Sequence, residues 1–459
     1  MNSAALRFLR QDPRCACVLV AIAVFALYVS HVLQKRKRAV NAPFVGLDIK
    51  SSRKRIQKYV YDAHSLLKEG CEKYPNGAFQ LQTPDGVKVI ITGKLIDELK
   101  DFPDDVLDIE STRLSLPDIT EELDYAFATE IPPTEEWKAV KLHPVLLRIV
   151  ALVVGRVLVG PSINRVDDWL TASIDFTTDV FVGAMILRMC PSWLRPVGQF
   201  FVPQIRRVHK HHAVARRFII PVVNERLAWI RNGFDEKHED MIQWLLTNGS
   251  EKDGGDPKDI ARLQLLVTFA GIHTSTMGVT NTMYDLAARP EYIKPLRDEI
   301  EAVLADTDGK FTKQALTKMK KLDSFMLESQ RVNPPEFATF TRKVMKPITL
   351  SNGTHLPVGT MLQIPVGFNR SLFDSPDEFD GFRFYNLRQE SETEANKHQY
   401  GTVSKRFFAG NMIKAITARF ILDYEFKLAD QSAGRPKNLR FQATNAPDPT
   451  KELLLRKRS

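Results

Sequence analysis

The stretch FAGIHTSTMG (residues 269–278) lies inside a segment whose pattern predicts one long helix over residues 257–289, ended by Pro290. Ala270 and Gly271 weaken this helix by up to about 1 kcal/mol, because glycine is a poor helix former. Their lack of side-chain bulk lets a large group approach the backbone. The stretch therefore predicts a helix with one face open to a bulky partner.

Three hydroxyl side chains follow, Thr274, Ser275 and Thr276. Each can donate a hydrogen bond to a carbonyl one turn earlier, which opens the helix locally. A helix opened beside hydroxyls is suited to binding oxygen or passing protons. Ordinary packing of two helices at small residues would give the same pattern, and both interpretations stay open on this stretch alone.

A second feature lies about 50 residues further on, in LESQRVNPP (327–335). Glu328 and Arg331 are three residues apart, so they share one helix face and can form an ion pair. Arg383 lies among aromatic residues in FDGFRFYNLR (379–388), a segment that we expect to be non-helical, and it could complete a network with that pair. A solvated surface pair and an ordinary aromatic and basic loop are the simpler alternatives.

From residue 51 onward the chain reads as mainly helical with small β elements. Residues 52–75 predict a helix closed by Gly70 and Pro75, and 312–332 predict another, ended by Pro334. Other predicted features are two strands in 79–92 about a Pro-Asp-Gly turn, a hairpin about Asn352 and Gly353, helices broken at Pro161, Pro191, Pro203 and Pro221, and a helix beginning at Arg406.

The N-terminal region predicts a membrane anchor. Residues 15–33 are uncharged and about 19 residues long, which at about 1.5 Å per residue nearly spans a bilayer core. Basic residues 35–38 follow and favour a cytosolic main domain, so we divide the chain into an anchor, 1–38, and a domain, 39–459. A cleaved secretory signal is the alternative, but no small-residue cleavage site follows.

Net charge and cysteine content limit the binding partners and the cellular compartment that we expect for this protein. The net charge of +9 fits an anionic membrane surface, and no zinc-finger or RNA-binding signature supports nucleic acid. The four cysteines, Cys15, Cys17, Cys71 and Cys190, form no disulfide framework, which suits a cytosolic domain. No cysteine follows Cys190.

Taken in order, these features resemble the cytochrome P450 family over roughly residues 50–459. AGIHTS matches the oxygen-binding helix pattern [A/G]-G-x-x-T-[T/S], ESQR matches E-x-x-R, and DGFRF matches the arginine of the family's meander, with Gly381 at its usual proline. The segment from Arg406 resembles the family's last long helix. The chain looks most like fungal secondary-metabolism members that oxidise diterpenes, including gibberellin-pathway and indole-diterpene enzymes, in which His273 often replaces an acidic residue.

The resemblance implies a heme monooxygenase whose iron is held by a cysteine thiolate, which favours cleavage of the O–O bond. It implies that Thr274 and His273 assist oxygen activation and proton delivery. It places Ala270 and Gly271 against the cofactor, and Glu328, Arg331 and Arg383 in a structural network. An NADPH-dependent reductase would supply electrons, at the endoplasmic reticulum membrane, to oxidise a hydrophobic, diterpenoid substrate.

The chain departs from the family at its metal ligand. The family's F-x-x-G-x-x-x-C-x-G loop precedes the last long helix, but here Lys405 joins Arg406 with no such loop anywhere in the chain. No residue is therefore predicted to bind the metal, since His398, the only imidazole nearby, would not give thiolate chemistry. A second shortening is expected near 108–114, where Arg113 would be the remnant of a propionate-binding basic site.

Two explanations fit this departure: sequence lost through a mis-assigned intron or alternative splice, or a degenerate, catalytically dead, membrane-anchored protein that binds a terpenoid or a partner. Readings from other classes are weaker. DDVLD (104–108), with Asp168, Thr171 and Asp175, half-matches the magnesium motifs of terpene synthases, but only about 60 residues separate the two. His209, His211 and His212 could bind a metal, although a solvated basic face is the simpler reading. Residues 198–205 form an apolar patch suited to a membrane surface.

Overall fold

The computed structural model describes residues 40–49, 51–84, 86–93, 95, 119–190, 194–233, 238, 240–248, 256–366, 375–390 and 407–458. Contacts within the chain divide it into two compact units. The sheet unit comprises Met1–Glu110 and Ala338–Ser371, and the helical unit comprises Ser111–Phe337 and Leu372–Ser459. The predicted anchor (15–33), the shortening near 108–114 and the junction of Lys405 with Arg406 all lie outside the described residues.

The sheet unit is built on a four-stranded sheet in the order β1-β2-β7-β4. Strands β2 and β7 are parallel, and the other neighbours are antiparallel. The elements of this unit are α3 (Ser52–Lys73), β1 (Ala78–Thr83), β2 (Gly86–Ile91), β4 (Ala338–Lys343), β5 (Ile348–Thr349), β6 (His355–Leu356) and β7 (Met361–Pro365). Both predicted hairpins are confirmed: β1 pairs with β2 across the Pro-Asp-Gly turn, and β5 pairs with β6 across Asn352 and Gly353.

Helix α3 packs on β1 and corrects one prediction. Gly70 does not close the helix, which continues to Lys73. A Cβ atom at Gly70 would clash with the ring of Phe79, so the glycine is required for the helix to approach the strand. The residue that looked like a helix end is a packing position.

The helical unit holds most of the hydrophobic core. Its helices are α5 (Thr120–Glu130), α6 (Leu142–Leu158), α7 (Pro161–Asn164), α8 (Asp167–Met189), α9 (Arg195–Gly198), α10 (Pro203–Arg231), α11 (Met241–Asn248), α13 (Pro257–Ala287), η1 (Pro290–Tyr292), α14 (Ile293–Ala305), α15 (Lys313–Lys318), α16 (Lys320–Val332), α17 (Arg383–Glu390) and α19 (Phe407–Asp423). Its strands are β3 (Lys138–Lys141), β8 (Tyr424–Leu428), β9 (Leu439–Phe441), β10 (Thr444–Ala446) and β11 (Glu452–Lys457). The mainly helical fold with small sheets is confirmed.

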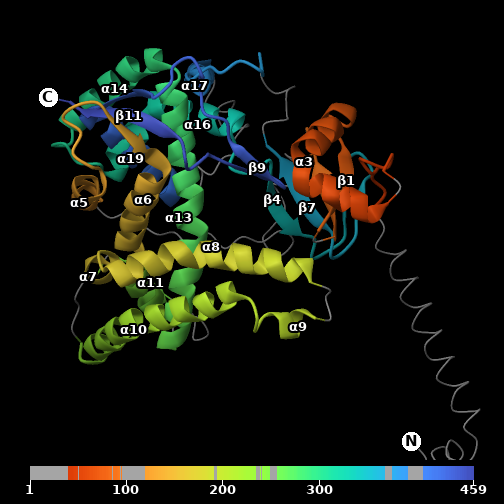
Figure 1. Ribbon diagram of the computed structural model, residues 1–459, viewed down its shortest axis with the longest axis horizontal. Coiled ribbons are helices and arrows are strands. Elements are labelled where there is room, and N and C mark those ends of the chain that lie inside the picture. Colours follow the sequence, from red (N-terminus) through yellow and green to blue (C-terminus); the bar gives the residue numbers. More distant parts are fainter. Residues whose placement is uncertain are drawn as a thin grey trace, which may run out of the picture. The chain divides into compact units, whose positions relative to one another are not determined.

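Helix α13 is the central element of the helical unit. It packs against α6, α8, α10, α16 and α19, and Figure 1 shows it crossing behind α8 and α10. Asp256 caps its first turn by accepting a hydrogen bond from the backbone N–H of Lys258 at 2.8 Å. Every residue between Gly278 and Ala287 is buried, including the polar Asn281 and Asp285. The long predicted helix is therefore confirmed, and its last part is surrounded by protein on all sides.

Two predicted helices differ from the structure in their continuity. The predicted helix over 312–332 is two helices, α15 and α16, because the backbone of the fully buried Met319 turns out of helical geometry at ψ 73°. Pro221, in contrast, does not break α10. Ile219 and Val223 are fully buried on either side of it, and their packing offsets the hydrogen bond that the proline removes.

One helix among the described residues, α8, is long and apolar enough over Asp167–Arg188 to cross a membrane by length and composition alone. It packs against α6, α10 and α13, and its Trp169 and Leu170 belong to the hydrophobic core. Helix α8 is thus an element of the helical unit.

Candidate active site

The middle of α13 has an exposed face. Leu266, Ala270 and Thr274 are spaced four residues apart and are all exposed, although the helix is buried from Gly278 onward. The Thr274 hydroxyl donates a hydrogen bond to the Ala270 carbonyl at 2.7 Å, and Thr276 donates to the Ile272 carbonyl at 2.8 Å. Two of the three predicted backward hydrogen bonds are present, and they lie beside the exposed face.

Two glycines of α13 have different surroundings. A Cβ atom at Gly278 would lie 3.1 Å from Cδ1 of Ile413, so this glycine lets α19 pack closely. A Cβ atom at Gly271 would meet only Cγ1 of Val154 at 3.8 Å, an ordinary contact. Contacts among the described residues therefore do not require a glycine at position 271, and the space beside it is open to another group.

His273 points away from that face. Its Nε2 lies 3.0 Å from the backbone oxygen of Ile174 on α8. Burial lowers the pKa of His273, an effect that the Ile174 hydrogen bond and the nearby Asp175 only partly oppose. His273 is thus a largely buried, neutral imidazole that donates to α8, while Thr274 faces outward. The structure does not bring these two predicted catalytic side chains to one point.

The residues predicted to form a structural network are in contact. Glu328 is fully buried on α16, and Arg331 binds its two carboxylate oxygens with Nε and Nη2, both at 2.7 Å. The Nε of Arg383 lies 3.3 Å from Oε1 of Glu328. A bidentate pair of this kind is strongly directional, so the surface-pair alternative is wrong for these residues.

Backbone groups of residues 375–380 complete this cluster. Arg331 donates to the carbonyls of Pro376 and Glu378, and Arg383 donates to those of Ser375 and Glu378. The N–H of Asp380 donates to Glu328 at 2.9 Å. Contrary to the sequence prediction, Arg383 is the first residue of a helix, α17, which begins there because the preceding backbone is held by α16.

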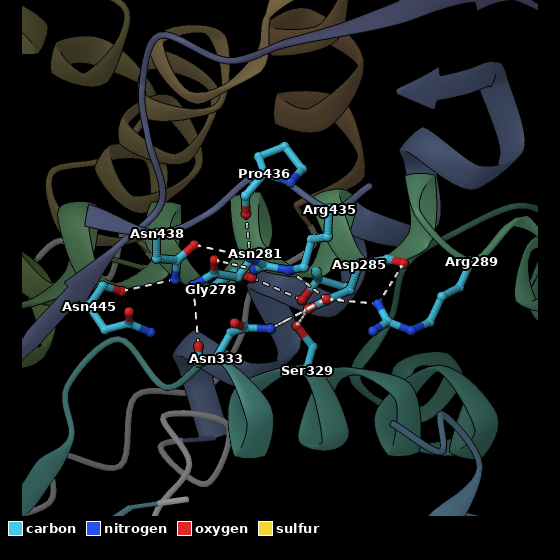
Figure 2. Close-up of polar contacts among 11 residues, drawn as sticks. Gly278, Asn281, Asp285, Arg289, Ser329, Asn333, Arg435, Pro436, Asn438 and Asn445 are labelled. Atoms are coloured by element: carbon cyan, nitrogen blue, oxygen red, sulfur yellow. Dashed lines mark hydrogen bonds and ion pairs between the residues drawn. The ribbon is translucent and has the colours of Figure 1, made fainter. Parts of the chain in front are cut away.

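A second buried carboxylate, Asp285 on α13, was not predicted (Figure 2). Its oxygens accept hydrogen bonds from the Ser329 hydroxyl at 2.6 Å, from Nε of Arg435 at 2.7 Å and from Nη1 of Arg289 at 3.0 Å. Asn333 donates to both oxygens at longer distance, 3.3 and 3.4 Å. Helix α13, helix α16 and the C-terminal segment are therefore joined at the carboxylate of Asp285.

The C-terminal segment is held at this cluster by Arg435. Its Nη2 donates to the side chain of Asn281 at 2.8 Å, and its Nη1 donates to the carbonyl of Pro436 at 2.7 Å. Asn445 continues the network by donating to the carbonyl of Pro334 at 2.9 Å. The contact between Asp285 and Arg435 could not be predicted from a local pattern, because 150 residues separate the two in the sequence. An Asp inside a long apolar helix was the one available hint.

Some predicted residues cannot be placed and others have different roles. Arg113, His398, Lys405, Arg406 and 104–108 lie outside the described residues. His211 contacts Asp179 at 2.9 Å, His212 packs against the ring of Phe176, and Asp168 pairs with Arg217. Among the described residues, no group of three or more His, Cys, Asp or Glu side chains could hold a metal.

Comparison with known proteins shows which family this chain resembles. The family model for cytochrome P450 matches residues 115–453. The chain is 36% identical to the cytochrome P450 monooxygenase braC of Annulohypoxylon truncatum, over 96% of this chain and 98% of that protein. It is 34% identical to the monooxygenase BOA4 of Botryotinia fuckeliana, over 96% of each, and 32% identical to the ent-kaurene oxidase of Gibberella intermedia, over 94% of this chain and 91% of that protein.

The aligned length carries further information. The alignment with braC extends over 497 positions, although the chain has only 459 residues. About 441 residues of the chain, 96% of 459, take part, so about 56 positions are filled in the relative and empty here. Since nearly the whole of both proteins is aligned, these gaps are internal. On the family match and these relatives together, the chain belongs to the cytochrome P450 family of monooxygenases.

Proposed function

We propose that the gene product oxidises a hydrophobic, diterpenoid substrate in fungal secondary metabolism, and that this 459-residue chain, as written, lacks the segment that binds the heme iron. The family assignment and the buried Glu328, Arg331 and Arg383 network support the first part. The second part rests on one observation: no cysteine follows Cys190 in a chain whose family ligates iron with a cysteine near its C-terminal end.

The substrate class rests on the relatives and on the face of α13. The ent-kaurene oxidase is named for a diterpene hydrocarbon, and the chain aligns with 91% of that protein. The exposed Leu266 and Ala270 offer an apolar surface beside Thr274, which suits a hydrocarbon skeleton. By the family resemblance, Thr274 and His273 would serve oxygen activation, and an NADPH-dependent reductase would supply the electrons.

Heme is expected from the family, and the described residues fit it only in part. The open space at Gly271 and the exposed face of α13 leave room for a large flat group. Neither described cysteine is suited to be its ligand. Cys71 is buried in the sheet unit, where burial raises the pKa of its thiol to about 12, and Cys190 lies at the end of α8, in a different part of the chain from the family's ligand. The described residues therefore offer a surface for the group but no thiolate ligand.

The missing positions favour lost sequence over gradual decay. About 56 internal positions are empty relative to braC, while the buried carboxylates Glu328 and Asp285 are both paired with basic side chains. Pairs of this kind are retained while a protein is under selection to fold, because breaking one is costly. Sequence lost through mis-assigned introns or an alternative splice, near 108–114 and at the junction of Lys405 with Arg406, would leave such gaps without disturbing these networks. The alternative is a dead, anchored, terpenoid- or partner-binding protein.

The proposed setting is the endoplasmic reticulum membrane. Residues 15–33 would form a single span, with the catalytic domain facing the cytosol. The net charge of +9 supports docking of an acidic reductase, since complementary charge speeds association.

The test is the spectrum of the purified chain supplied with heme, reduced and exposed to CO. We expect no thiolate-type Soret band from the chain as written. Insertion of the corresponding segment of braC between Lys405 and Arg406 should produce one, and a copy of that segment with its cysteine changed to alanine is the control. A thiolate band from the unmodified chain would refute the proposal, and genomic DNA without a cysteine loop at this junction would favour the dead protein.

A further inference from the structure

Asp323 joins two helices that lie on either side of residues 391–406. It stands in the first turn of α16. Its Oδ2 lies 2.6 Å from Nη2 of Arg388, in the last turn of α17, and its Oδ1 lies 2.9 Å from Nζ of Lys414 on α19. One carboxylate thus binds the element before this stretch and the element after it.

The Lys414 contact is buried. The residue is 5% exposed, and its ammonium also donates to the carbonyl of Leu316 at 3.0 Å. A buried ammonium is costly without an anionic partner, so Lys414 depends on Asp323. Burial alone would raise the pKa of the Asp323 carboxyl, but the charges of Lys414 and Arg388 outweigh it and lower that pKa.

The Arg388 side of the contact is reinforced locally. The backbone N–H of Tyr385 donates to the Ser324 hydroxyl at 2.9 Å, so two adjacent residues of α16 hold α17. The charges also suit the helix ends, because an acid in a first turn and a base in a last turn both interact favourably with the helix dipole. All of these partners come from described residues and need no bound cofactor.

We propose that Asp323 is a positioning residue, a clamp that sets the relative places of α17 and α19 and so holds both flanks of the family's iron-ligand loop. This inference rests on the proposed function for the identity of the loop. The clamp itself is a property of the chain as written. It predicts that the two flanks keep their places whether or not the loop is present.

The first test uses the full chain as it exists, with hydrogen–deuterium exchange of the amides in α17 and in the first turns of α19. Asp323→Asn should speed exchange in both helices about tenfold or more, since local opening no longer breaks the ion pairs. Asp298→Asn is the matched control, because it removes an exposed ion pair with Lys294 on α14. Unchanged exchange in Asp323→Asn, or an equal effect from the control, would overturn the clamp.

A double-mutant cycle separates the clamp from general damage. Lys414→Met removes the buried charge, so adding Asp323→Asn to it should change exchange in α19 far less than Asp323→Asn does alone. Equal effects in both backgrounds would show that Asp323 and Lys414 are not coupled, which contradicts the proposal.

The second test uses the chain carrying the braC segment. There Asp323→Asn should lower the share of the reduced, CO-bound spectrum that shows the thiolate-type band, and Asp323→Glu should restore part of it. A thiolate share unaffected by Asp323→Asn would limit Asp323 to stability and overturn its positioning role. If no heme is bound even with Asp323 intact, the proposed function fails, whereas the exchange experiment still decides the clamp.

Discussion

The pKa values of two histidines in the helical unit are determined mainly by the burial of their side chains. His143 on α6 and His273 on α13 are both largely buried, and each has a lowered pKa with burial as its main cause. The pKa of His143 falls from its ordinary 6.5 to about 4, with the neighbouring His273 adding to the effect. Both imidazoles are therefore neutral near pH 7, and protonating either one opposes the folded state.

This arrangement predicts a loss of stability in mild acid. A histidine whose pKa is lowered by folding binds a proton more readily when the chain is unfolded. The contribution of His143 to the free energy of unfolding is therefore complete above pH 6.5 and is lost as the pH falls toward 4. His143→Gln should remove up to about 3 kcal/mol of that pH dependence of the free energy of unfolding. Urea titrations at several pH values measure it, with the exposed His209→Gln as control. Parallel pH curves for the wild type and His143→Gln would contradict the assignment.

The secondary-structure elements are tied together by carboxylates on two helices, two of them fully buried and one partly buried. Glu328 and Asp323 on α16 hold α17 and the start of α19, and Asp285 on α13 holds α16 and the C-terminal segment through Ser329 and Arg435. Each carboxylate binds at least two donors from elements distant in sequence. Such contacts add little net energy when made but cost much when one partner is lost. They determine which of these helices are held against one another.

Removing one of these carboxylates should therefore destabilise the helical unit strongly. Glu328→Gln leaves two buried guanidinium groups without their anion, and Asp285→Asn takes the anion from the partly exposed guanidinium groups of Arg435 and Arg289. Each should cost about 3–5 kcal/mol in the free energy of unfolding. Asp298→Asn, which breaks the exposed pair with Lys294, should cost less than about 1 kcal/mol. Chemical denaturation monitored by circular dichroism compares them, and similar losses in all three variants would exclude a special role for the buried pairs.

At the scale of the molecule, the helical unit has an extensive hydrophobic core. Its buried residues come from α5 through β11 and include Trp169, Tyr284 and Phe420. The carboxylates of Asp285, Asp323 and Glu328 beside this core are paired with the protein's own groups. The exposed face of α13, with Leu266, Ala270 and Thr274, leaves room for a partner that the described residues do not provide.

The proposed loss of the iron-ligand segment predicts that added heme does not stabilise this chain. A ligand raises the melting temperature only if it binds the folded state, by RT ln(1 + [L]/Kd). With no thiolate ligand, a hundredfold excess of heme should leave the melting temperature of the written chain unchanged within about 1 °C. The chain with the braC segment should gain about 2.7 kcal/mol at a heme concentration 100 times Kd. Differential scanning calorimetry distinguishes the two, and equal gains would show heme bound without the loop.

The local pattern of the sequence by itself determined most elements of this protein. The long helix at α13 and both hairpins follow from spacing and turn residues, which are local properties, and three short motifs carry the resemblance to the family. That no cysteine follows Cys190 is likewise read directly from the sequence. The sequence predicted the pairing of Glu328 with Arg331 because residues three positions apart on a helix share a face.

Only the tertiary structure decided which side chains meet across long distances. Gly70 lies within a helix because Phe79 packs on it, and His273 turns toward Ile174, away from Thr274. The clusters at Asp285 and Asp323 join segments whose separation in sequence gives no pattern to recognise. The physical reason is the same in each case: a buried charge or a close contact is satisfied by whichever groups the fold brings near, and a linear sequence does not record that proximity.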